Sequence, residues 1–331
     1  MQILFPMHTL ERGGGCRVVA EAANGLAARG HRVFLALPEG APLSWPVRAE
    51  IVRVPRLAPE FMPAADLAIA TFYTTVPVAA GLRRPFIRFC LGFEPLWVPD
   101  PGTALATYRW PRPIVTISTW LQEIILRRTG RTSHLVHPGV DCAAFHPYGN
   151  KGAYGRPGVV FILRGPGYSW KGAELLWQAM GRVLARRPDA KLLLIANDEA
   201  GDPGLGLPYL LLRAPGDEEL ARIISAGDVF VFPSLFEGFG LPPLEAMACG
   251  TAVVTTANGG VRDYAQHGVN CLLVPPGRVE PLAEAILALI EDGGLRERLA
   301  AGGQATAAAW NWYRFYDEMH HLVTGLAFAR G

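Results

Sequence analysis

Lysine is scarce in this chain. Only three of the 31 basic side chains are lysines, at positions 151, 171 and 191, and the others are arginines. Ala, Gly and Pro are abundant, so we read the arginine excess as a compositional bias in which a single arginine carries little functional information. A lysine inside a motif carries more. The formal net charge is only +2, which argues against the broad basic face of a nucleic-acid-binding protein.

Cysteines and long apolar runs are scarce too. The five cysteines are scattered and never stand at metal-ligand spacing, so we expect reduced thiols and no metal site. The chain has neither a signal-peptide pattern nor an apolar run near the roughly 18 residues of a membrane span. These absences predict a cytoplasmic protein. Peripheral contact with the inner face of a membrane stays open, because an apolar helix predicted over 119–128 has arginines at its end.

What is present is a repeated alternation of short apolar strands and helices. Half of the 331 residues are hydrophobic, enough for two buried cores. The alternation predicts two α/β domains with parallel sheets. The Gly-rich, charged stretch 150–158 sets the boundary. We predict an N-terminal domain over 1–150, a second over 151–309, and a C-terminal helix over 310–331 that crosses back to the first.

The most specific segment is Pro-Ser-Leu-Phe-Glu-Gly-Phe-Gly-Leu-Pro-Pro-Leu-Glu-Ala-Met-Ala-Cys-Gly over 233–250. A strand ends before it, and Pro242 and Pro243 mark the first turn of a helix. The preceding Gly-Phe-Gly-Leu therefore offers backbone N–H groups at a helix start, where a phosphate binds well. Glu237 and Glu245 can face one site from different heights, as acceptors for sugar hydroxyls. A proline-started helix with a favourable acidic residue is the plain alternative.

This segment resembles the paired-glutamate motif of retaining glycosyltransferases of family 4. The resemblance implies the GT-B fold, two Rossmann-like doubly wound domains that face each other across a cleft. It implies that Glu237 contacts the donor sugar and Glu245 the ribose. It also implies that the distal phosphate meets the backbone of the turn, at Gly238, Phe239, Gly240 and Leu241.

A second group of residues follows the first strand of the second domain. Arg164 ends that strand and Lys171 begins a helix after a glycine-containing turn. Two cations there suit a diphosphate whose negative charge grows as the sugar leaves; a solvated surface pair is the plain alternative. The resemblance implies that this pair replaces a metal ion, and no Asp-x-Asp loop stands in a plausible metal-binding position.

A glycine-rich loop over 11–16 precedes a helix predicted over 18–29. The family places such a loop against the donor phosphates, which makes Gly14 and Gly15 the candidates. The loop also admits an NAD-dependent oxidoreductase, with Glu39 as the ribose-binding acid. Against that alternative, Val18 stands where the third glycine belongs, and the loop lies well beyond the first strand.

The stretch 86–95 departs from the family pattern. Many relatives carry a histidine or aspartate near the sugar here, whereas this chain offers Glu94 as the only acidic side chain. We predict that Glu94 faces the acceptor, with a solvated loop residue as the alternative. The surrounding residues resemble a rhamnosyltransferase-like branch.

Together these features predict a retaining, metal-independent hexosyltransferase. The donor would be a UDP-, GDP-, ADP- or dTDP-sugar, and the acceptor a hydroxyl of a glycan, a lipid-linked sugar or a small molecule. A GT-B sugar-nucleotide epimerase or hydrolase and a non-catalytic nucleotide-sugar binder remain as alternatives.

Overall fold

The computed structural model describes residues 1–165, 167–196 and 203–328, and it divides the chain into two compact units. The first contains Met1–Pro138 and the C-terminal helix, and the second is Gly139–Asn311. The sequence placed the boundary at 150, so residues 139–150 differ from the prediction in belonging with the second unit. Their bonds explain this: the Val140 N–H donates to the Trp310 carbonyl at 2.8 Å, and the Tyr148 N–H to the Ser225 hydroxyl at 2.8 Å.

The first unit is built on a sheet of seven parallel strands in the order β3-β2-β1-β4-β5-β6-β7. The central strands β1, β4 and β5 are almost entirely buried, as expected for parallel strands covered on both faces, and β5 buries the charged Arg88 among its apolar residues. The strands are β1 (Gln2–Pro6), β2 (Arg32–Pro38), β3 (Glu50–Val54), β4 (Leu67–Ala70), β5 (Phe86–Cys90), β6 (Ile114–Thr116) and β7 (His134–Leu135).

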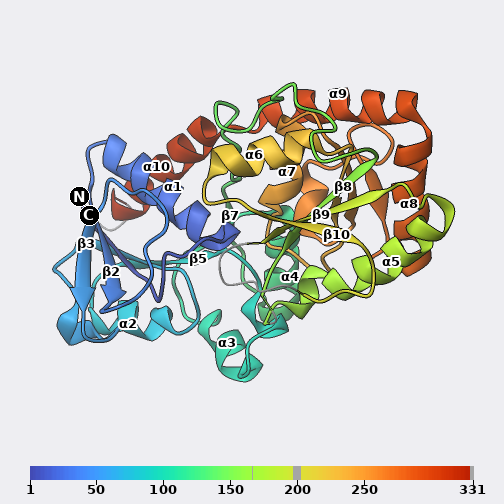
Figure 1. The fold of residues 1–331 in the computed structure, drawn as a ribbon. Coiled ribbons are helices and arrows are strands. Elements are labelled where there is room, and N and C mark those ends of the chain that lie inside the picture. Colours follow the sequence, from blue (N-terminus) through green and yellow to red (C-terminus); the bar gives the residue numbers. More distant parts are fainter. Residues whose placement is uncertain (166, 197–202, 329–331) are drawn as a thin grey trace. The chain divides into compact units, whose positions relative to one another are not determined.

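The α-helices in the described part of this unit are α1 (Gly14–Ala28), α2 (Thr75–Gly81), α3 (Pro101–Thr107), α4 (Thr119–Thr129) and α10 (Trp312–Phe328). Helix α1 begins at the glycines themselves, earlier than the predicted start at 18. Helix α10 lies beside α1 (Figure 1), and the Tyr316 hydroxyl donates to Glu21 at 2.5 Å. A Cβ on Gly25 would lie 2.4 Å from the Tyr316 ring, so the small residue permits this close packing.

The second unit is built on six parallel strands in the order β10-β9-β8-β11-β12-β13. The strands are β8 (Gly158–Leu163), β9 (Lys191–Ala196), β10 (Tyr209–Arg213), β11 (Val229–Phe232), β12 (Ala252–Thr256) and β13 (Leu272–Val274). The order reverses between β8 and β11. In open α/β sheets, ligands bind beyond the carboxyl ends of the strands at such a point.

The helices of the second unit are α5 (Ala173–Arg186), α6 (Asp217–Ala226), α7 (Leu241–Ala248), α8 (Val279–Glu291) and α9 (Gly293–Ala309). Alternate strand residues, such as Val159, Phe161 and Leu163 of β8, pack with α5 and α8 in one core. Helices α7 and α9 pack against each other and against β12. The prediction of two Rossmann-like α/β domains is confirmed. None of the described helices combines the length and apolar character needed to cross a membrane.

Candidate functional site

The two residues of greatest predicted importance meet at the strand-order reversal of the second sheet. Lys171 ends a short 3-10 helix (Ser169–Lys171) after β8, and Glu237 lies in the loop after β11. The Lys171 Nζ donates to both carboxylate oxygens of Glu237, at 2.7 and 2.9 Å. Their side chains keep 22% and 11% exposure. The pair is therefore desolvated enough to be strong and open enough to meet a ligand.

The turn between Glu237 and α7 ends in a glycine with a left-handed backbone conformation. Gly240 is the residue before the helix and has φ +89, a left-handed conformation that favours glycine. Leu241 begins the helix, with prolines in the first turn. The N–H groups at this start have no acceptor within the helix, so the turn can hold an anion. Glu245 lies further along α7 and is 6% exposed.

The loop that follows β12 packs against this turn. The Glu237 N–H donates to the Asn258 carbonyl at 3.0 Å. A Cβ on Gly260 would lie 2.5 Å from the Phe239 backbone, so the two loops touch main chain to main chain. The Tyr264 hydroxyl donates to the Gly240 carbonyl. These contacts fix the backbone whose N–H groups are predicted to meet the phosphate.

Glu237 and Glu245 share one neighbourhood around Tyr264. Burial, together with the negative charges that include these two carboxylates, raises the pKa of the Tyr264 hydroxyl well above its ordinary value. The Trp310 ring packs on Tyr264 and Phe239, with centroids 5.9 and 5.7 Å away. Sequence reasoning missed Tyr264 and Trp310, because neither belongs to a motif and only the folded chain brings them to the turn.

Arg164 directly follows β8, one residue beyond the strand that it was predicted to end, and its guanidinium lies 5.1 Å from the ring centroid of Tyr168. The Tyr168 ring in turn contacts Trp170, and Trp170 precedes Lys171. The second predicted cation is therefore held through the aromatic residues of the same turn. Pro166 of this turn lies outside the described residues.

Gly14 and Gly15 belong to the first unit, where they are the first residues of α1 and are exposed. A Cβ on Gly15 would lie 3.6 Å from Leu91, an ordinary contact. Their role in binding the donor phosphates stays a prediction.

Glu94 requires a correction. Its side chain is only 3% exposed and forms an ion pair at 2.9 Å with Arg88, which is 2% exposed. The Tyr108 hydroxyl donates to the same carboxylate, and the Arg88 guanidinium lies 3.9 Å from the centroid of the Tyr108 ring. Neither an accessible acceptor-side acid nor a solvated loop residue fits this burial, because the carboxylate is already bonded inside the first unit.

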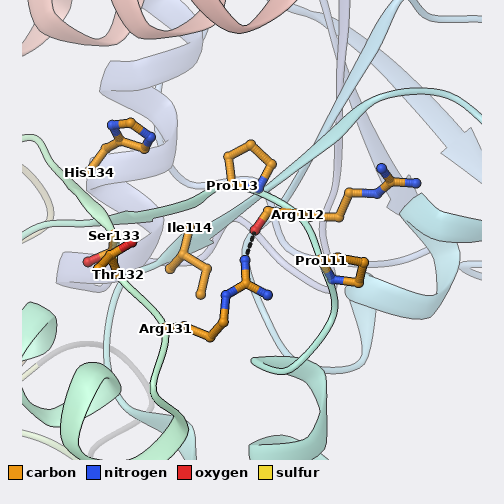
Figure 2. A pocket seen from close by; sticks show the side chains of 8 residues that line it. All are labelled: Pro111, Arg112, Pro113, Ile114, Arg131, Thr132, Ser133 and His134. Carbon is orange, nitrogen blue, oxygen red and sulfur yellow. Dashed lines mark hydrogen bonds between the residues drawn. The ribbon is translucent and has the colours of Figure 1, made fainter.

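The first unit also contains a pocket (Figure 2). It is lined by Pro111, Arg112, Pro113, Ile114, Arg131, Thr132, Ser133 and His134. These residues flank the amino ends of β6 and β7, the edge opposite to the one where ligands bind in such sheets. The Arg131 guanidinium donates to the carbonyls of Trp110 and Arg112 at 2.6 and 2.9 Å. It therefore joins two loops.

Within the described ranges, no three His, Cys, Asp or Glu side chains are grouped so that they can hold a metal ion.

Part of the second unit matches a known protein family. Residues 156–292 match the family described as glycosyl transferases group 1. A "D-inositol 3-phosphate glycosyltransferase" of Kribbella flavida is 32% identical over 200 residues, which cover 54% of this chain and 47% of that protein. The match thus spans about half the length of the relative. The predicted resemblance is confirmed, whereas the rhamnosyltransferase-like branch finds no support in these names.

Solved structures match the whole chain. Sucrose-phosphate synthase from Thermosynechococcus elongatus covers 100% of both chains, with a TM-score of 0.82 and 22% identity. HepE of Anabaena, solved with UDP-glucose, covers 98% of this chain and 100% of its own, with a TM-score of 0.82 and 20% identity. At this identity the likeness shows the fold alone. The chain has the GT-B fold, and residues 156–292 of its second unit match the family of group 1 glycosyl transferases.

Proposed function

We propose that the chain transfers a hexosyl group from a nucleotide diphosphate sugar to a hydroxyl acceptor, with retention of anomeric configuration and without a metal ion. The observation that carries this proposal is the Lys171–Glu237 ion pair at the strand-order reversal, beside the start of α7. A cation, a carboxylate and a helix start at one place suit a diphosphate joined to a sugar.

Each group has a separate task in this reaction. The N–H groups of the 238–241 turn bind the distal phosphate, and Lys171 neutralises the charge that grows on it as the bond to the sugar breaks. Glu237 accepts hydrogen bonds from the sugar hydroxyls, and Glu245 from the ribose. The acceptor hydroxyl attacks the anomeric carbon from the leaving-group side, the carbon–phosphate oxygen bond breaks, and the acceptor proton passes to a phosphate oxygen. Arg164, Gly14 and Gly15 complete the diphosphate contacts.

The names of similar proteins suggest which substrates to try first. The HepE structure contains UDP-glucose, and the curated relatives are named for D-inositol 3-phosphate. UDP-, GDP-, ADP- and dTDP-sugars with inositol phosphate, simple sugars and lipid-linked sugars therefore form the first panel. A sugar-nucleotide epimerase or hydrolase on the same fold would change the donor without an acceptor, so analysis of the products separates it from a transferase.

Substitution of the ion pair tests the proposal. In Lys171→Ala and Glu237→Ala we expect turnover to fall at least about a hundredfold, the scale of losing one preorganised charged group. Glu245→Ala should raise the KM for the donor more than it lowers kcat. Lys191→Ala is the matched control, because this lysine is the first residue of β9 and so lies at the amino end of a strand, whereas Lys171 follows the carboxyl end of β8. Addition of EDTA should leave the rate unchanged. Near-normal turnover in both Lys171→Ala and Glu237→Ala would exclude this site assignment.

A further inference from the structure

The loops that carry Lys171 and Glu237 are joined to each other by more than the ion pair. The Leu235 N–H donates to the Trp170 carbonyl at 2.8 Å. The rings of Trp170 and Phe236 stack with centroids 5.8 Å apart and planes only 11° from parallel. Both rings are half-buried. Offset stacks of this kind add specific attraction to the area that they bury.

The stack is one residue away from each partner of the ion pair. Trp170 precedes Lys171, and Phe236 precedes Glu237. After Lys171 the loops remain in contact, because a Cβ on Gly172 would lie 2.2 Å from the Pro233 carbonyl oxygen. The stack therefore holds the two loops together directly beside the residues whose side chains form the ion pair.

The Glu237 loop is held on its other side by the end of β12. The Thr256 hydroxyl donates to the Ser234 carbonyl, and the Asn258 carbonyl accepts from the Glu237 N–H. The Leu235–Trp170 hydrogen bond and the ring stack join this anchored loop to the loop that carries Lys171.

We propose that Trp170 and Phe236 are positioning residues for sugar transfer, which hold the Lys171 ammonium and the Glu237 carboxylate in the register that one diphosphate sugar requires. This inference rests on the proposed function and adds to it two residues that act through their neighbours. Because a misplacement of about 1 Å can cost on the order of a hundredfold in rate, loss of the stack should appear in kcat.

The test compares variants of both rings in the full chain. In Trp170→Leu and Phe236→Leu we expect kcat to fall about tenfold to a hundredfold, with the donor KM within about threefold of its original value. Trp170→Phe keeps an aromatic ring and should recover most of the rate. Leu235→Ala is the matched control, since this side chain lies in the same loop and is 43% exposed; its rate should stay normal.

A double-mutant cycle asks whether Trp170 acts through Lys171. If it does, adding Trp170→Leu to Lys171→Ala should lower kcat by no more than about twofold further, because the two changes remove one effect. Thermal unfolding of each variant gives the folded fraction, so that kcat refers to folded protein. This correction keeps the test valid if a variant folds poorly.

Three results would overturn the positioning role. A raised donor KM with unchanged kcat would mean that the rings bind the donor themselves. Normal kcat per folded molecule would mean that the stack only stabilises the fold. Multiplicative losses in the double variant would mean that Trp170 acts independently of Lys171. If the wild-type chain transfers sugar and both leucine variants keep its kcat, only this inference is refuted. If the wild-type chain transfers sugar from none of the donors, the proposed function is refuted, and the inference with it.

Discussion

Glycine decides the geometry of the site at two positions. Gly240 gives the turn before α7 its left-handed conformation, and Gly260 lets the supporting loop touch the Phe239 backbone. The role of Gly240 could be read from the sequence, because a glycine directly before a helix that starts with prolines is a local pattern. The role of Gly260 could not, because a contact between two loops separated by more than twenty residues leaves no local pattern.

Gly260→Ala should disturb the turn without disturbing the rest of the second sheet. The added Cβ would lie 2.5 Å from the Phe239 backbone, so one of the two loops must move. We expect the affinity for the nucleotide sugar to fall about tenfold or more, because the backbone N–H groups that donate to the charged phosphate would be displaced. Gly181→Ala in α5 is the control, since a Cβ there meets nothing within 4 Å. Equal donor affinity in both variants, measured by calorimetry, would contradict the contact.

Glu94 was predicted to face the acceptor because it is the only acidic side chain in its stretch, but its burial in an ion pair with Arg88 indicates a structural role. Removing one partner of a buried ion pair leaves the other charge without compensation, at a cost of about 3–5 kcal/mol. Glu94→Ala should therefore destabilise the first unit strongly, measured by thermal or denaturant unfolding. Glu50→Ala breaks a solvent-exposed pair with Arg32 and should change the unfolding temperature little. A stable Glu94→Ala variant with sharply reduced transfer would restore the catalytic role that the burial argues against.

At the scale of elements, strands were predicted well and helix starts less so. Strands β4 and β11 are buried and apolar throughout, and such short apolar runs are the signal that predicted the alternation of strands and helices. Helix α1 starts at Gly14 although glycine disfavours helices, so the pattern placed the start too late. The boundary near residue 138 escaped prediction because residues 139–150 are fixed by distant partners in the second unit.

Helix α10 joins the first unit through a pair of histidines. The rings of His31 and His320 approach to 3.0 Å between Nε2 and Nδ1, and Arg29 forms an ion pair with Asp317 alongside. Burial, helped by the positive charges of the amino terminus and His320, lowers the pKa of His31. Two facing imidazole nitrogens cannot both carry a proton and keep this hydrogen bond.

This lowered pKa predicts an acid-sensitive helix. Below about pH 6.5 the unfolded chain takes up a proton that His31 in the folded chain resists. Stability from this site is therefore complete above about pH 6.5 and decreases as the pH falls below it. We expect the Tm to fall between about pH 7.5 and pH 5.5, and to fall less in His31→Gln. His8, whose pKa burial also lowers, is present in both proteins and cancels in the comparison. An equal fall in the two proteins would contradict the role of the pair.

At the scale of the whole molecule, the second unit places its ion pair where the strand order of its sheet reverses. The strand order of the second sheet reverses between β8 and β11, and the loops that follow these two strands carry Lys171 and Glu237. Two separate local patterns predicted these residues, Glu237 from the segment before α7 and Lys171 from the turn after β8. The aromatic stack and the Tyr264 contact were not predictable, because they depend on which strands become neighbours.

The central claim is that the site around Lys171 and the 238–241 turn binds the diphosphate of a nucleotide sugar. Isothermal titration of UDP-, GDP-, ADP- and dTDP-sugars into the full chain, without added metal and with EDTA, tests it most directly. One donor should bind. Its Kd should rise about tenfold to a hundredfold in Lys171→Ala, as expected for a lost charge-assisted hydrogen bond, and stay unchanged in Lys191→Ala. Equal affinity of that donor for both variants, or no binding by any donor, would contradict the account.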